Sequence, residues 1–184
     1  MQNQKLLIVL VVLFIASIWM TQAADSETVS PKIYLPLVVK QREVIFFDDF
    51  SDPGSGWPMG DWQHDRFRYI NNEYEILLRT GNIWTGASAP VDDITNYTVE
   101  AEMRQHSGSN GGYGIIFERE EWDQFYLFIV FPDLQGYALA RNNLGWDELI
   151  PATFSQLIKQ GAETNRLEVK RVGSQITLYI NGVQ

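Results

Sequence analysis

Two glutamates, two residues apart, have a spacing that suits hydrolytic chemistry. Glu100 and Glu102 fall within an apolar–polar alternation over residues 97–104, which predicts a β-strand with both carboxylates on one face. Two carboxyl groups that share a cleft can act as acid and nucleophile in glycoside hydrolysis. Arg104 follows on the same face and would hold a neighbouring carboxylate ionised. We therefore expect a solvated polar strand face without catalysis, and Glu100 and Glu102 are the candidate catalytic residues of the alternative, an enzyme.

Two further carboxylate groups come without a catalytic motif. Asp48, Asp49 and Asp52 offer oxygens that suit Ca²⁺, although their spacing does not match an EF-hand loop. A second acidic group, which we expect to consist of solvated turn residues, comprises Glu118, Glu120, Glu121 and Asp123. The sequence has no Gly-rich phosphate loop followed by Lys-Ser or Lys-Thr and no paired histidines at metal-ligand spacing. We therefore expect no cofactor, with Ca²⁺ bound by these aspartates as the alternative.

Aromatic residues near predicted loops suggest a binding function instead. Trp122 and Trp146 flank the predicted strands that carry Tyr126 and Arg141. Flat indole rings suit the apolar C–H faces of sugars, and Tyr and Trp combine an apolar body with a hydrogen-bonding tip. We expect these aromatic and basic side chains to meet at one rim and bind a ligand, together with Glu102 and Arg104. The alternative is that the loop tryptophans cap the ends of the core.

Composition narrows the classes of partner. The chain has 184 residues with a formal net charge of −9, and 45% of them are hydrophobic, enough for one globular core. An acidic chain is repelled by phosphate backbones, which argues against nucleic acid as a partner. The sequence has no cysteine, so neither disulfides nor a thiolate metal site can form.

The N-terminus has the pattern of an export signal. Lys5 precedes an apolar run of roughly 15 residues, and Ala23 ends a sequence that suits signal-peptidase cleavage. We predict a signal peptide over residues 1–23, a linker or tether over 24–43, and a secreted or cell-surface protein of bacterial type. The run is shorter than the ~20 residues that span a bilayer, so no stable membrane anchor is expected, although an uncleaved anchor is the alternative.

Two hairpins can be read with their registers. Gly173-Ser174 joins residues 166–172 to 175–180, and pairing Val172 with Gln175 makes one face apolar and the other polar. Asn71-Asn72 joins residues 67–70 to 73–78 in the same way. Further strands are predicted over residues 44–49, 97–104, 113–119, 125–131, 137–141 and 148–150. Short, turn-rich loops lead us to expect the strands over 97–104, 113–119 and 125–131 to be neighbours in one antiparallel sheet.

This order of elements resembles the concanavalin A-like lectin/glucanase superfamily, closest to its laminin-G-like and keto-disaccharide-hydrolase-like branches. The resemblance covers residues 44–184 and implies an antiparallel jelly-roll β-sandwich. The residues that carry it are Phe47-Asp48-Asp49-Phe50, Gly56-Trp57, the strand over 97–104, Gly112-Tyr113-Gly114-Ile115-Ile116-Phe117, Phe125-Tyr126-Leu127-Phe128, Asn165-Arg166-Leu167-Glu168-Val169 and Leu178-Tyr179-Ile180-Asn181-Gly182.

The resemblance also frames the function. Glucanases of this superfamily carry a Glu-x-Asp-x-x-Glu strand motif; here Glu102 replaces the aspartate and the third acid is missing. We therefore expect a secreted, non-catalytic module that binds an extracellular glycan or protein ligand. The first alternative is a glycan-processing hydrolase of the keto-disaccharide-hydrolase-like type, and the second is a structural or adhesion spacer.

We also expect residues 44–184 to form a domain that lacks its last strand or strands. Jelly-roll relatives continue after the Asn-Gly turn with a strand that returns beside the first one, and two residues after Gly182 are too few for it. An edge left uncovered in this way invites pairing with another chain.

Overall fold

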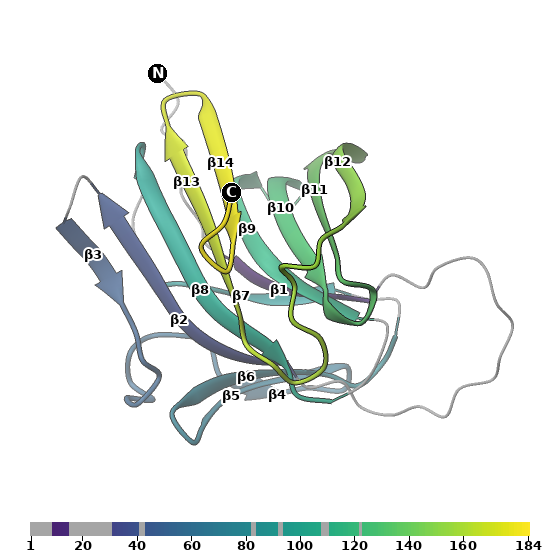
Figure 1. The fold of residues 1–184 in the computed structure, drawn as a ribbon. Helices are drawn as coiled ribbons and strands as arrows, with labels where there is room; N and C mark the ends of the chain where they lie inside the picture. Colours follow the sequence, from purple (N-terminus) through teal and green to yellow (C-terminus); the bar gives the residue numbers. More distant parts are fainter. Residues whose placement is uncertain are drawn as a thin grey trace, which may run out of the picture.

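The structure, a computed structural model, describes residues 9–14, 31–40, 43–81, 84–91, 94–107, 111–121 and 123–184; for 9–14, 31–40, 43, 120 and 121 it describes the backbone alone. Two antiparallel sheets face each other in a β-sandwich-like arrangement (Figure 1). Sheet A runs in the order β12 (Trp146–Phe154), β11 (Gly136–Asn143), β10 (Gln124–Phe131), β9 (Gly111–Glu121), β1 (Val9–Phe14), β7 (Trp84–Ser88). Sheet B runs in the order β14 (Gln175–Ile180), β13 (Asn165–Val172), β8 (Tyr97–Gln105), β2 (Pro31–Lys40), β6 (Glu73–Leu78), β5 (Asp65–Ile70), β4 (Gly60–Asp61), with β3 (Glu43–Phe47) beside β2. A short 3₁₀ turn, η1 (Pro132–Leu134), follows β10.

The main core lies between the two sheets and follows from strand alternation. On β8 the odd-numbered Val99, Ala101 and Met103 are fully buried, while the residues between them are only partly buried. They pack against inward residues of sheet A such as Ile115 and Phe128. Figure 1 shows β13 and β14 standing opposite β10 and β11 across this core. The prediction that Val99, Ala101 and Met103 face the core is confirmed.

Both predicted hairpins form in the predicted register. Val172 pairs with Gln175 across the β13–β14 turn, and Tyr69 pairs with Tyr74 across the β5–β6 turn. Asn71 and Asn72 both have positive φ (53° and 56°), the conformation that a two-residue hairpin turn requires.

The expected neighbourhood of β8, β9 and β10 is wrong for β8. Strands β9 and β10 pair antiparallel in sheet A, whereas β8 lies in sheet B between β13 and β2. The segment after Gln105 is long enough to cross the ~10 Å between facing sheets, since an extended residue spans about 3.3 Å. A short loop therefore excludes a distant partner strand but not a change of sheet.

Two strands lie in segments that the sequence assigns to the predicted signal peptide and linker. Strand β1 pairs with β7 on one side and β9 on the other. Strand β2 pairs with β8 along most of its length, and with β6 and β3 on its other side. Cleavage after Ala23 and the incomplete last strand both stay predictions.

Candidate ligand-binding pocket

One row of side chains crosses sheet A where β10 begins and β11 ends. Tyr126 lies opposite Phe117 of β9 and opposite Arg141 of β11, and Arg141 lies opposite Asp147 of β12. The Tyr126 and Phe117 rings stack with their centroids 5.5 Å apart, and Arg141 Nη2 donates to Asp147 Oδ2 over 2.6 Å. Phe117 and Tyr126 pack with the main core, so this row faces sheet B.

A bulge in β9 adds Glu118 to the same side. Phe117 pairs with Tyr126, and Glu121 pairs with Gln124. Four residues of β9 therefore cover the distance of two residues of β10. Regular alternation would send Glu118 to the outer face with Ile116. Instead Glu118 has φ 54°, a left-handed backbone conformation that residues other than Gly rarely adopt. The bulge thus turns the carboxylate toward sheet B, as bulges near binding sites often re-aim a side chain.

Sheet B supplies the partners of this carboxylate. The Tyr97 hydroxyl donates to Glu118 Oε1 over 2.8 Å, and Arg171 Nη1 donates to the same oxygen over 2.8 Å. Arg171 Nε also donates to the Gly173 carbonyl, and Gly173 N donates to Asn96 Oδ1. Burial, and then the Glu118 charge, raise the pKa of the Tyr97 phenol, so it stays a proton donor at neutral pH. The β13–β14 hairpin tip is therefore tied to sheet A through Glu118.

These groups surround a cavity of about 320 Å³, here called the polar pocket. Its lining consists of Glu118, Gln124, Phe125, Tyr126, Arg141, Asn142, Asn143, Arg171, Ser174 and Ile176. Each arginine is balanced by its own carboxylate, Arg171 by Glu118 and Arg141 by Asp147. Hydrogen bonds to Asp147 and then to Tyr126 raise the pKa of the Arg141 guanidinium. The pocket thus offers many planar hydrogen-bonding groups but little net charge.

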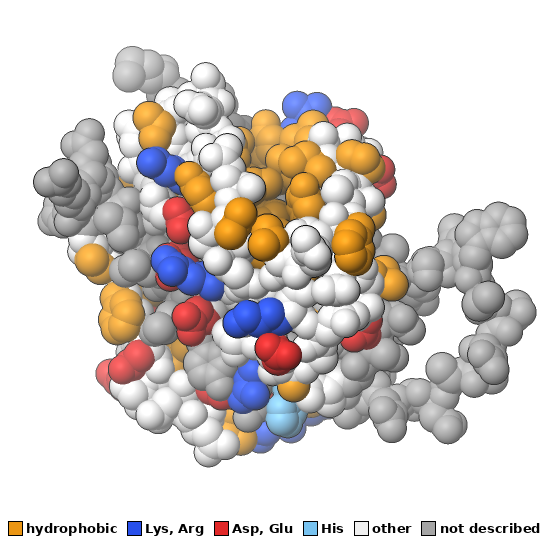
Figure 2. Space-filling model, viewed as in Figure 1, with side chains coloured by type: hydrophobic (Ala, Val, Ile, Leu, Met, Phe, Trp, Pro, Cys, Tyr) orange, Lys and Arg blue, Asp and Glu red, His pale blue; other side chains and the backbone are white. Residues whose placement is uncertain are grey.

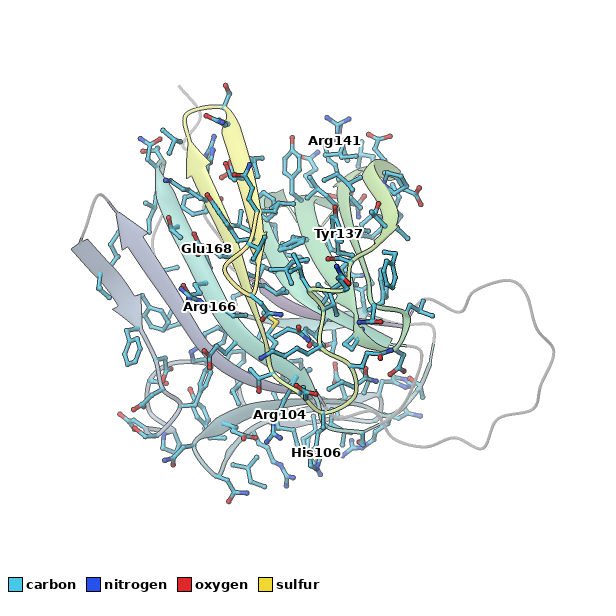
Figure 3. All side chains as sticks on the ribbon, in the orientation of Figure 1. Arg104, His106, Tyr137, Arg141, Arg166 and Glu168 are labelled. Carbon is cyan, nitrogen blue, oxygen red and sulfur yellow. The ribbon has the colours of Figure 1, made fainter. Side chains whose placement is uncertain are left out.

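Glu102 and Arg104 lie elsewhere, on the outer face of sheet B. Glu102 lines a separate hollow of about 480 Å³ with Lys159, Thr164, Arg166 and Asn181. Arg104 forms an ion pair with Glu73 over 2.8 Å. Glu100 pairs with Arg166, and Figure 3 shows Arg166 and Glu168 on β13, away from Arg141. The structure therefore brings Tyr126 and Arg141 together but separates them from Glu102 and Arg104.

Trp146 lies on the other face of sheet A from the polar pocket. It pairs with Asn142 and lies beside Phe125, which packs with Ile116 and Leu127 in the outer cluster of sheet A. The ring centroids of Trp146 and Phe125 are 5.7 Å apart, and those of Phe125 and Trp84 are 5.8 Å apart. The prediction for Trp122 lies outside the described residues.

The three aspartates near β3 hold turns together. Asp48 accepts hydrogen bonds from Phe50 N and from the Ser55 hydroxyl, and Asp49 and Asp52 accept from backbone N–H groups two residues on. Within the described residues, no group of three or more His, Cys, Asp or Glu side chains is placed to hold a metal ion. Calcium binding by these aspartates stays an untested alternative.

Sequence reasoning missed Glu118 and Arg171 as pocket residues. The prediction of a solvated turn carboxylate is wrong for Glu118, whose side chain is 11% exposed and paired with Arg171, 17% exposed. No Gly or Pro marks the bulge in the sequence, and an Arg near a hairpin tip reads as a surface residue. The ion pair between the two sheets is what shows that both side chains point inward.

Comparisons of the chain with models of protein families, with curated proteins and with solved structures found no significant match. The described residues include no helix of the length and apolar character needed to cross a membrane.

Proposed function

We propose that this protein is a secreted, non-catalytic jelly-roll module that binds a neutral extracellular glycan in the polar pocket. The observation that carries the proposal is the convergence of Tyr126, Arg141, Glu118 and Arg171 in one cavity between the sheets. Planar guanidinium, amide and carboxylate groups can each bind neighbouring sugar hydroxyls, and the Tyr126 ring offers an apolar surface beside them. The resemblance to concanavalin A-like proteins supports the same proposal.

The charge balance of the pocket defines the class of glycan. Because both arginines are already paired with carboxylates, an anionic sugar would have to compete with Glu118 or Asp147. A neutral sugar instead accepts from and donates to groups held in place by these pairs. The strained φ of Glu118 supports the assignment, since backbone strain clusters at functional sites.

A glycan array tests the proposal with Arg141→Ala and a matched control. Arg141 is 41% exposed, so its loss should leave the fold intact, and we expect the best neutral ligand to bind about 10- to 100-fold more weakly. Arg166→Ala is the control, because Arg166 is similarly exposed (47%) and ion-paired but lines the hollow of sheet B. No glycan binding by the parent protein, or equal loss in both variants, would refute the polar pocket as the site.

A glycan-processing hydrolase is the second candidate, favoured by one observation on sheet B. Glu168 lies directly opposite Glu100 on the neighbouring strand. Burial, and then the Glu100 charge, raise the pKa of Glu168, while Arg166 binds the Glu100 carboxylate. Such a contrast between two carboxyls suits an acid and a nucleophile. Release of reducing sugar that Glu168→Gln abolishes and Glu163→Gln preserves would favour the hydrolase.

A further inference from the structure

A second cavity, lined mainly by apolar side chains, lies beside the polar pocket between the same two sheets. This apolar cavity measures about 380 Å³. Its lining consists of Phe128, Tyr137, Leu139, Ile150, Phe154, Ser155, Leu157, Ile176, Thr177, Leu178, Ile180, Val183 and Gln184. Figure 2 shows hydrophobic side chains gathered in the hollow between the β13–β14 hairpin and strands β11 and β12.

The apolar cavity and the polar pocket adjoin each other, and the pair is called the groove here. Ile176 lines both of them. On the opposite wall, β11 contributes Tyr137 and Leu139 to the apolar cavity and Arg141 to the polar pocket, at alternate positions of one strand. Figure 3 shows Tyr137 and Arg141 at successive heights on this wall. The side chains along this wall therefore change from the charged Arg141 to Leu139 and the aromatic Tyr137.

Strand β14 gives the length of the apolar part of the groove. Ile176, Leu178 and Ile180 are alternate residues of β14, so the apolar part extends about 13 Å at roughly 3.3 Å per residue. Beyond Ile180, the Asn181-Gly182 turn brings Val183 back to pair with Ile180, and Val183 lines the cavity. A linear apolar group that lies along β14 would extend from Ile176, beside the polar pocket, to this turn.

We propose that the ligand is an amphipathic glycoside, with its sugar in the polar pocket and an aliphatic or aryl aglycone along the apolar cavity. The inference rests on the proposed function and specifies its ligand class. A sugar alone would leave the apolar walls in water, whereas an aglycone removes them from water. Each methylene that enters the cavity should raise the affinity about fourfold.

Calorimetric titration with methyl, butyl and octyl β-D-glucosides, galactosides and mannosides tests the inference, with each octyl compound below its micelle concentration. Phe154→Ser removes an apolar wall residue that is 69% exposed, so folding should survive. Leu134→Ser is the matched control, because Leu134 is 66% exposed and does not line the cavity. Leu178→Ser, from the opposite wall, is a second variant with the same purpose. Sedimentation velocity on the same samples detects self-association.

We expect the affinity to rise with alkyl chain length in the parent protein and in Leu134→Ser. In the two cavity variants, the gain in affinity from the methyl to the octyl glycoside should be at least fivefold smaller. Methyl glycosides should bind all four proteins equally. Equal affinity across the series would overturn the inference while leaving the proposed function intact, provided that methyl glycosides bind. Octanol binding as tightly as octyl glycosides would overturn it too, as would a dimer that octyl glycosides do not dissociate. Failure of every methyl glycoside to bind would count against the proposed function itself.

Discussion

Replacing Glu118 by Gln should destabilise the protein by an amount set by the burial of its ion pair. The Glu118 and Arg171 side chains are 11% and 17% exposed. Exposed pairs contribute about 0.2–1 kcal/mol, and breaking a fully buried pair costs about 3–5 kcal/mol. Gln still accepts the hydrogen bond from the Tyr97 hydroxyl, so this phenol keeps its partner. We therefore expect a loss of about 2 kcal/mol in the free energy of unfolding.

Thermal unfolding followed by circular dichroism measures this loss. For a chain of this size, about 2 kcal/mol corresponds to a Tm lowered by roughly 4–8 °C. Glu163→Gln is the control, because Glu163 is exposed and its substitution should change the free energy of unfolding by less than about 0.5 kcal/mol. A cycle with Arg171→Met should give a coupling free energy of about 1–2 kcal/mol. A Tm for Glu118→Gln within about 1 °C of the control would refute the inward-facing carboxylate.

Three further predictions test the sheets around the pocket. In Gly114→Ala the new Cβ would lie 2.0 Å from the Phe128 carbonyl oxygen, so β10 must move. Urea unfolding should show a free energy of unfolding that is lower by about 3 kcal/mol. Gly145→Ala is the control and should be neutral, because its new Cβ would have no atom within 4 Å. Burial alone would raise the pKa of Glu75, but hydrogen bonds from two arginines outweigh it and hold the pKa below 4.5. The stability that Glu75 contributes is therefore full above about pH 5 and is lost as the pH falls through its folded pKa, and the Tm difference from Glu75→Gln should shrink between pH 6 and pH 3. Asn165→Ala removes buried hydrogen bonds to the Tyr113 hydroxyl and to the Lys159 backbone. It should lower the free energy of unfolding by about 3 kcal/mol and speed hydrogen exchange in residues 157–161. Unchanged exchange in these residues would contradict this role of Asn165.

Local pattern predicted the hairpins and the faces of β8, because turn chemistry and period-two alternation act within a few residues. The pairing of Val172 with Gln175 and the burial of Val99 follow directly from them. Alternation indicates which way a side chain points but not which strand lies beside it. The position of β8 in sheet B therefore depends on long-range packing that the sequence pattern does not contain.

The candidate site was partly accessible from sequence. The sequence predicts Tyr126 and Arg141 as ligand-binding residues, and they lie side by side on β10 and β11. Trp146 was equally suggestive, yet the pairing of β11 with β12 sends it to the opposite face. Glu118 shows the limit most clearly, because a bulge without Gly or Pro reverses the direction of a side chain.

The location of a bound glycan distinguishes the polar pocket from the hollow of sheet B. Backbone amide shifts of ¹⁵N-labelled protein should be followed while the best array ligand is added. We predict the largest changes at the entrance of β10, the end of β11 and the β13–β14 hairpin tip, including Tyr126, Arg141 and Ser174. Largest changes around Glu102 and Arg166 in the hollow of sheet B, with the polar pocket unaffected, would contradict the account.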